Sequence, residues 1–162
     1  MNKAIKYKPI GIIHTPFKHS KGTPIQASGA KETKGKIEVL CDFEKGLKDL
    51  SGFSHIILLY HFHLSKKPEL LQTPFLDDEP HGVFAIRSPS RPNSIGLSVV
   101  RLDKIEKNII YISDVDIVDG TPLLDIKPYI FEFDLRKNTK SGWLDKTATK
   151  ISATKDDGRF SR

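Results

Sequence analysis

Residues 83–100 have the sequence VFAIRSPSRPNSIGLSVV, in which two apolar runs flank a ten-residue segment with two prolines. Proline fixes its own φ and favours extended geometry in the residue before it, so we expect residues 87–96 to form a stiff loop between two strands. Arg87 and Arg91 lie in this loop, and each offers a planar fork of donors that suits a carboxylate or a phosphate. The loop is therefore a candidate ligand site. The alternative is a polar turn whose arginines are only solvated.

Outside this loop, short extended runs alternate with turn residues. The expected strands are residues 10–13, 36–40, 53–64, 83–86, 97–100, 109–112, 115–118 and 123–126, with a hairpin turn at 106–108. We expect one helix after Asp42 as N-cap, because Phe43, Leu47 and Leu50 would form a single apolar stripe. Residues 17–36 have no apolar period and are expected to form a long loop. This pattern predicts a mainly β fold: a small closed or strongly bent β-barrel with one or two short helices.

The predicted strand at residues 53–64 has two different faces. Alternation places Ile56, Leu58, Tyr60 and Phe62 on one face, and His55, Ile57, Leu59, His61 and His63 on the other. Histidine is a common zinc ligand, but only His61 and His63 are close enough along a strand to share an ion. They have no acidic or cysteine neighbour to complete a site. We therefore expect no metal, and interpret these histidines as core or hydrogen-bonding residues.

Composition sets broad limits on the protein class. A chain of 162 residues that is 38% hydrophobic and 28% charged is typical of one globular domain with a core of its own. The single cysteine, Cys41, excludes an internal disulfide and a cysteine-rich zinc site. The N-terminus lacks an apolar signal core, and the longest apolar run, residues 56–60, is too short to span a bilayer. We expect a cytoplasmic protein without membrane association.

Positive charge is concentrated at the C-terminal end. Residues 136–162 hold eight basic and three acidic residues, which is +5 of the net charge of +6. We therefore divide the chain into a domain at residues 1–135 and a basic segment at 136–162. Such a segment attracts polyanions with salt-dependent affinity, although a solvated tail without a partner is the alternative. Trp143 could either anchor the segment on the core or stack on a base.

Four blocks of the sequence resemble the TsaA/TrmO family of S-adenosylmethionine-dependent tRNA methyltransferases, which are built on a small β-barrel. The blocks are residues 82–98, 10–18, 52–55 with the following 62–63, and 116–129, and together they extend over most of the chain. The resemblance implies methylation of N6 of threonylcarbamoyladenosine at position 37, next to the anticodon of a threonine tRNA. It also implies a homodimer with the cofactor pocket near the interface. Bacterial relatives continue into a small additional C-terminal domain, so the basic segment is a candidate substitute for it in substrate docking.

The resemblance also implies a set of site residues. The expected contacts to S-adenosylmethionine are Gln26, His63, Leu64, Arg87, Leu97, Asp119, Gly120, Thr121, Leu124, Asp125 and Ile126. Arg91 and Asp125 are the catalytic candidates; Arg87 and Arg91 would hold the cofactor carboxylate and a substrate carboxylate or phosphate. A carboxylate near the sulfonium would stabilise its positive charge, whereas Asp119 could instead only shape a turn. The family's Pro-Arg-Gln motif is Pro-Ile-Gln here, with Ile25 replacing the arginine.

The usual markers of methyl transfer are absent from this sequence. It contains no strand-loop-helix with a Gly-x-Gly fingerprint and no Asn-Pro-Pro-Tyr-like motif. Composition alone favours a nucleic-acid-binding β domain, and the residues nominate no general base. A non-catalytic RNA-binding barrel and a methyltransferase for a different acceptor are therefore the alternative functions.

Overall fold

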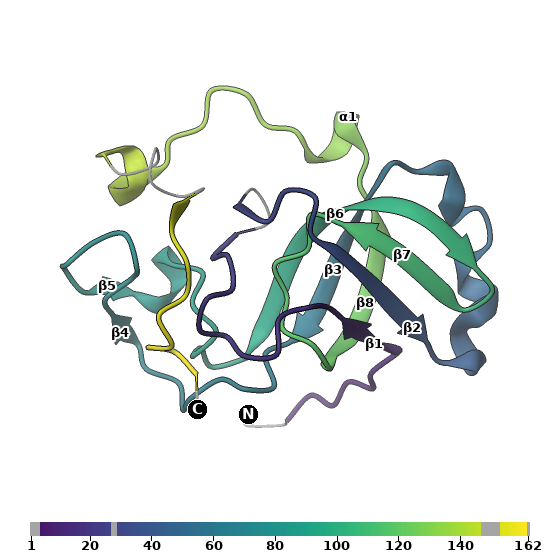
Figure 1. Ribbon diagram of the computed structural model, residues 1–162. Helices are drawn as coiled ribbons and strands as arrows, with labels where there is room; N and C mark the ends of the chain where they lie inside the picture. Colours follow the sequence, from purple (N-terminus) through teal and green to yellow (C-terminus); the bar gives the residue numbers. More distant parts are fainter. Residues whose placement is uncertain (1–3, 27–28, 147–152, 162) are drawn as a thin grey trace.

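Six antiparallel strands form a closed barrel. The computed structural model describes residues 4–26, 29–146 and 153–161 (Figure 1). Around the barrel the order is β1-β2-β7-β6-β3-β8, and β8 pairs with β1 to close it. The strands are β1 (Gly11–His14), β2 (Lys34–Val39), β3 (His55–His61), β6 (Ile95–Glu106), β7 (Ile109–Ser113) and β8 (Thr121–Pro128). The predicted mainly β barrel is confirmed.

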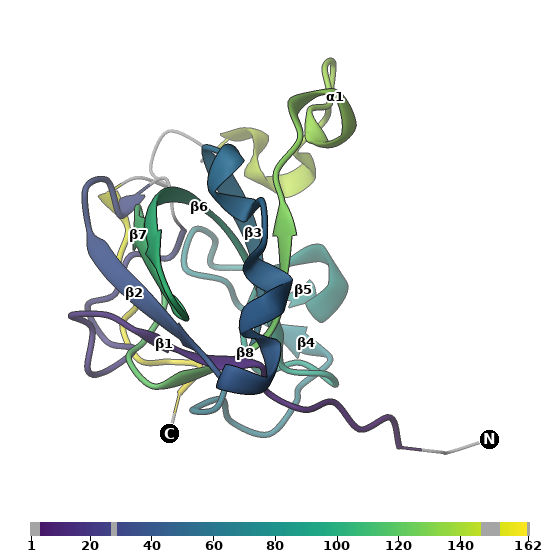
Figure 2. The same cartoon turned by 90° about the vertical axis from the view of Figure 1, so that its right-hand side faces the viewer.

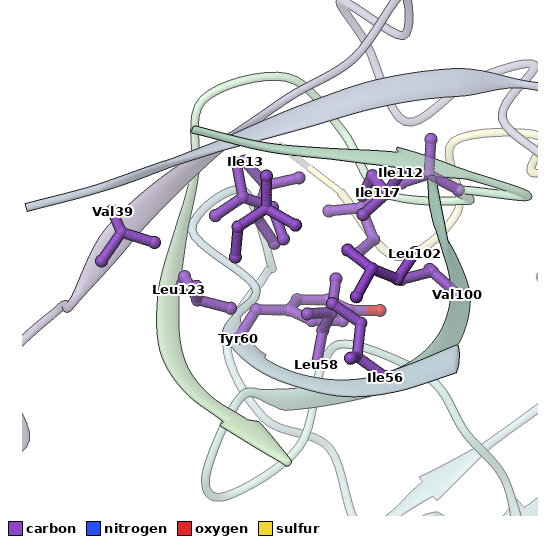
Figure 3. Close-up of a cluster of buried hydrophobic side chains, with 13 residues drawn as sticks. Ile13, Val39, Ile56, Leu58, Tyr60, Val100, Leu102, Ile112, Ile117 and Leu123 are labelled. Atoms are coloured by element: carbon purple, nitrogen blue, oxygen red, sulfur yellow. The ribbon is translucent and has the colours of Figure 1, made fainter. Parts of the chain in front are cut away.

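Period-two alternation fills the barrel interior. On β3, Ile56, Leu58 and Tyr60 are buried while the residues between them are half-buried, so the predicted faces are confirmed. Equivalent side chains from the other strands complete a core that includes Ile13 and Val100 (Figure 3). Small barrels are filled by their own side chains in this way. A ligand site on this molecule must therefore lie at the rim of the barrel or outside it.

The register between β3 and β6 positions the proline-bearing loop. Tyr60 pairs with Gly96 and His61 with Ile95, so the loop that precedes β6 lies beside the C-terminal end of β3. Gly96 is required here because a Cβ at this position would lie 2.2 Å from a ring carbon of Tyr60. The hairpin turn between β6 and β7 is present as predicted, with Lys107 at a φ of 54°.

Three predicted elements differ from the structure. The helix after Asp42 is instead two 3₁₀ segments, η2 (Cys41–Leu47) and η3 (Leu50–Gly52), interrupted by Asp49 at a φ of 65°. Asp42 lies inside η2 rather than capping it. The apolar stripe still contacts the core through Leu47 and Leu50, whereas Phe43 is exposed. Figure 2 shows these segments from the end of the barrel that they cover.

Two apolar runs that we predicted as strands have no strand partner. Residues 83–85 form a 3₁₀ turn, η4 (Val83–Ala85), in which Val83 is buried and Phe84 is exposed. Residues 115–118 are extended but unpaired; Val115 and Ile117 nevertheless enter the core. Val83, Val115 and Ile117 are buried as apolar residues usually are, but burial alone does not establish a strand.

Several of the remaining segments, though not α1, lie at the opposite end of the barrel from η2 (Figure 1). A two-stranded sheet, β4 (Leu71–Gln72) and β5 (His81–Gly82), lies there, and the chain after β8 continues through α1 (Phe131–Asp134) and η5 (Gly142–Lys146). Residues 153–161 then return along the 17–26 segment, where the Asp156 and Thr23 backbones hydrogen-bond and Lys155 bridges Pro24. This part of the basic segment is packed on the barrel domain, not free. Within the described residues, no helix is long and apolar enough to cross a membrane.

Candidate functional site

A cavity of about 460 Å³ lies beside the barrel, where these segments meet the end of β3. Its walls come from residues within 20–26, 60–65 and 87–97, and from residues 116–118, Thr121, Phe75, Asp156 and Ser161. The volume is within the usual range for small-molecule and cofactor sites. Because the C-terminal segment contributes Asp156 and Ser161, residues from both ends of the chain are needed to enclose the cavity.

The proline-bearing loop is held rigidly against its surroundings. Ser88 and Ser90 are buried, and the Ser88 hydroxyl hydrogen-bonds to the Gln72 side chain. Gln72 Nε2 donates to the Ser90 carbonyl at 2.6 Å, and Ser90 Oγ donates to the Phe160 carbonyl at 3.0 Å. Arg91 Nη1 donates to the Ile86 carbonyl of its own loop at 3.1 Å. The predicted non-helical loop is present, although the segment before it is a 3₁₀ turn and not a strand; hydrogen bonds to β4 and to the C-terminal segment hold it.

Arg87 lines the same cavity as the acidic Asp116 and the phenolic Tyr60. Its Nη1 donates to Gln26 Oε1 at 3.2 Å, so two residues far apart in the sequence meet in the cavity wall. The positive charge of Arg87 also acts on Asp116 and Tyr60, where it opposes the rise in the pKa of each group. A cation placed here can hold a ligand carboxylate at one end of the cavity.

Three polar residues form a hydrogen-bonded chain at the cavity wall. Ser98 Oγ donates to Asp116 Oδ1 at 2.7 Å and lies 3.0 Å from the Tyr60 hydroxyl. A serine hydroxyl has one proton, so Tyr60 is the donor to Ser98. Burial raises the pKa of Tyr60 above its usual value, which keeps the phenol protonated. Burial also raises the pKa of Asp116, while the Ser98 hydrogen bond and Arg87 oppose that rise.

Our sequence reasoning did not single out Asp116 or Ser98. The available signal was weak: Ser98 is a polar residue at an inward, buried position of β6, between Gly96 and Val100. Asp116 lies in an apolar run that looked like a strand. A polar residue at a core position is informative because it needs a buried partner.

His63 and Thr121 meet at another part of the wall. Thr121 Oγ1 donates to the Val118 carbonyl at 2.6 Å and lies 3.4 Å from His63 Nδ1. Partial burial, and then the neighbouring His61, lower the pKa of His63, so its imidazole is neutral near pH 7. A neutral imidazole beside a hydroxyl can hydrogen-bond a polar ligand without adding charge to the site.

Residues 12–135 match the tRNA-methyltransferase O (TrmO) N-terminal domain. The chain belongs to this family. A probable S-adenosyl-L-methionine-binding protein of Pyrococcus abyssi is 59% identical over 96% of this chain and 85% of its own length. The human tRNA (adenine(37)-N6)-methyltransferase is 40% identical over 85% of this chain, but this chain spans only 33% of that protein. A crystal structure of TrmO from Pseudomonas aeruginosa superposes with a TM-score of 0.73 at 36% identity, covering 88% of this chain and 64% of the other.

Most of the site residues predicted from the TrmO resemblance lie around one cavity. Those that line it are Gln26, His63, Leu64, Arg87, Arg91, Leu97 and Thr121. Ile25, which replaces the arginine of the TrmO motif, lines it as well. The structure thus brings together residues from four separate parts of the sequence. Their roles toward a ligand stay predictions.

The other predicted residues lie elsewhere. Asp119 accepts hydrogen bonds from Lys18 at 2.7 Å and from the Thr15 backbone at 3.0 Å; chiefly the Lys18 bond lowers the pKa of Asp119. Gly120 follows it at a φ of 76°, so the two residues shape the turn before β8. Leu124, Asp125 and Ile126 lie on β8, and the last two line a second hollow of about 590 Å³ under η2 and η3. Across the described ranges, no group of three or more His, Cys, Asp or Glu is arranged to hold a metal ion.

Proposed function

We propose that this protein is an S-adenosylmethionine-dependent methyltransferase that acts on N6 of adenosine 37 in tRNA. The observation that carries the proposal is that this member of the TrmO family has a cavity lined by residues of three of the four sequence blocks that resemble the family. The probable S-adenosylmethionine-binding relative in Pyrococcus abyssi and the human adenine-37 methyltransferase support the cofactor and the acceptor.

The residues around the cavity fit the cofactor. S-adenosylmethionine supplies an electrophilic methyl group when bound, and combines a carboxylate, a sulfonium and an adenosine. Arg87 provides a cation for the carboxylate. Phe62, Leu64 and Leu97 provide apolar surface for the adenosine. Arg91 remains the candidate for a carboxylate or phosphate of the substrate.

Positioning accounts for most of the expected rate. Methyl transfer is an in-line displacement, so a site that aligns the nitrogen with the methyl carbon and excludes water removes much of the barrier. The Ser88, Gln72 and Ser90 hydrogen bonds hold the proline-bearing loop in one geometry, which lowers the cost of that alignment. The threonylcarbamoyl form of adenosine 37 in a threonine tRNA is our specific candidate acceptor, because a carboxylate on the base would suit Arg91. Such a substrate places the reaction in the cytoplasm.

A homodimer would extend this site. Leu59 pairs with Leu97 on one side and with Asp125 on the other, so the three side chains lie on one outer face of the barrel. Leu97 is 53% exposed and also lines the cavity. Burying this face between two copies would remove apolar surface from water and bring the partner's β8 close to the cavity rim. Asp125 would then act across the interface, consistent with its position outside the cavity of its own chain.

Calorimetric titration tests the cofactor, and a methylation assay tests the acceptor. We expect saturable S-adenosylmethionine binding that Arg87→Ala weakens by about tenfold or more, because a charge-assisted contact is lost. Arg136→Ala, at an exposed arginine outside the cavity, should leave binding unchanged. Methyl transfer to tRNA carrying threonylcarbamoyladenosine, compared with unmodified tRNA, then identifies the acceptor. Salt-dependent RNA binding without cofactor binding would replace this proposal with a non-catalytic RNA-binding barrel.

A further inference from the structure

The Asp116 carboxylate is unusual among the charged groups of this molecule. It lines the cavity, yet within the described ranges no Lys, Arg or His forms an ion pair with it. Its position is fixed by Ser98, which is itself fixed by the buried Tyr60. A half-buried acidic group without an ion-pair partner costs stability, so its place in a cavity wall indicates a functional role.

Two opposing effects act on the pKa of Asp116. Burial raises the pKa of Asp116 and so makes the carboxylate a stronger base than an exposed aspartate. The Ser98 hydrogen bond and the Arg87 charge favour the ionised form and limit that rise. A general base is most effective when its pKa approaches the working pH from below.

The other basic candidates around the cavity fit this role less well. Burial and His61 lower the pKa of His63, so it is a weaker base than a free histidine. Asp156 also lines the cavity, but its Oδ1 accepts from the Gly158 backbone at 2.6 Å and its own backbone pairs with residues 22 and 23. Asp156 is therefore engaged in holding the C-terminal segment in place.

We propose that Asp116 is the catalytic base that accepts the N6 proton of the nucleoside as the methyl group is transferred. This inference rests on the proposed function. In the step, the N6–H bond breaks and its proton moves to the Asp116 carboxylate. The nitrogen electron pair forms the new N–CH₃ bond, and the electrons of the breaking C–S bond remain on sulfur, which becomes a neutral thioether. Tyr60 and Ser98 are positioning residues that aim the carboxylate.

The test compares Asp116→Asn with Asp78→Asn, an isosteric change at an exposed aspartate that does not line the cavity. We expect Asp116→Asn to lower the methylation rate constant at saturating cofactor by about 10²- to 10⁴-fold, the usual contribution of a general base. Its cofactor affinity in calorimetry should remain close to that of the wild type. Asp78→Asn should retain the rate constant, because Asp78 lies outside the cavity. The assignment would be overturned if Asp116→Asn kept the wild-type rate constant. It would also be overturned if a loss of cofactor affinity accounted for the whole defect.

A second variant, Ser98→Ala, tests the role of Asp116 through the pH dependence of the rate, which a purely structural role of Asp116 would not alter. Ser98→Ala removes a hydrogen bond that favours ionised Asp116, so the acid limb of the pH–rate profile should move to higher pH. The rate at alkaline pH should recover, because the carboxylate is still present. An unshifted acid limb would overturn the proposal even if Asp116→Asn does not fold. If the wild type binds the cofactor but methylates no tRNA, the proposed function itself fails, and this inference with it.

Discussion

At the scale of single residues, the sequence best predicted the site residues whose side-chain chemistry and local backbone signals both indicate a ligand site. Arg87 and Gln26 were predicted as ligand-binding residues, and they meet in the cavity wall. Asp116 and Ser98 could not be predicted as a pair, because their contact depends on an unpaired segment crossing beside β6. Periodicity shows which side chains point inward, but not which inward polar groups find each other.

Gly96 provides a stability prediction at this scale. A Cβ there would overlap three ring carbons of Tyr60, so Gly96→Ala should lower the free energy of unfolding by about 1–3 kcal/mol, as overpacking does. It should also disturb the Tyr60–Ser98–Asp116 chain. Gly82→Ala is the matched control, because nothing lies within 4 Å of a Cβ at that position. Denaturant unfolding of both variants measures the difference, and equal stabilities would contradict the close packing of Tyr60 on Gly96.

At the scale of elements, the paired strands were predicted more accurately than the segments that are not strands. Alternation located β1, β2, β3, β7 and β8, because half-buried strands have a period of two. The apolar spacing at residues 43–50 suited a helix, but a left-handed Asp49 divides the segment into 3₁₀ turns. The basic segment was interpreted from its charge and from Trp143; its contacts also depend on buried Phe160, which neither signal considers.

Phe160 ties the C-terminal segment to the cavity. Its ring packs edge-on against Phe75, with the ring centroids 5.1 Å apart, and its carbonyl accepts a hydrogen bond from Ser90 of the proline-bearing loop. Phe160→Ala should cost up to about 3–5 kcal/mol of stability and weaken cofactor binding, because Asp156 and Ser161 would lose their support. Phe84→Ala removes the same ring from an 80% exposed position and should change neither property. Thermal unfolding and calorimetry distinguish the two, and unaltered binding in Phe160→Ala would show that the segment does not shape the cavity.

At the scale of the whole molecule, the placement of positive charge bears on RNA binding. Part of the basic segment is used internally: Arg159 pairs with Asp157 at 2.7 Å and donates to the Pro74 carbonyl. Trp143 stacks on His81 and donates to the Ala85 carbonyl, so it anchors the segment. Lys137 and Lys140 remain exposed between α1 and this anchor. They are the described residues of the segment best placed to contact a phosphate backbone.

The double variant Lys137→Ala/Lys140→Ala should weaken tRNA binding and reduce its dependence on salt. Each lost phosphate contact lowers the slope of log affinity against log salt by roughly 0.9 for a duplex. Lys45→Ala/Lys48→Ala, on the η2 side of the barrel, removes the same charge and should retain the wild-type slope. Binding titrations at several salt concentrations give both slopes. Identical slopes for the two double variants would assign RNA binding to another surface.

The pairing of Gly11 with Leu123 has a consequence for how this protein folds. The first strand of the barrel has its closing partner near the end of the barrel sequence, so the ring is completed only after almost the whole domain has been synthesised. Contacts of such high sequence separation slow folding, because the entropy of closing the chain is lost before the contacts compensate for it. The β-bridge between Pro24 and Lys155 also joins residues that are far apart in the sequence, and it lies beside the cavity. The cavity is therefore also completed late in synthesis. On the ribosome, the site can therefore assemble only after the barrel does, when the last residues have emerged.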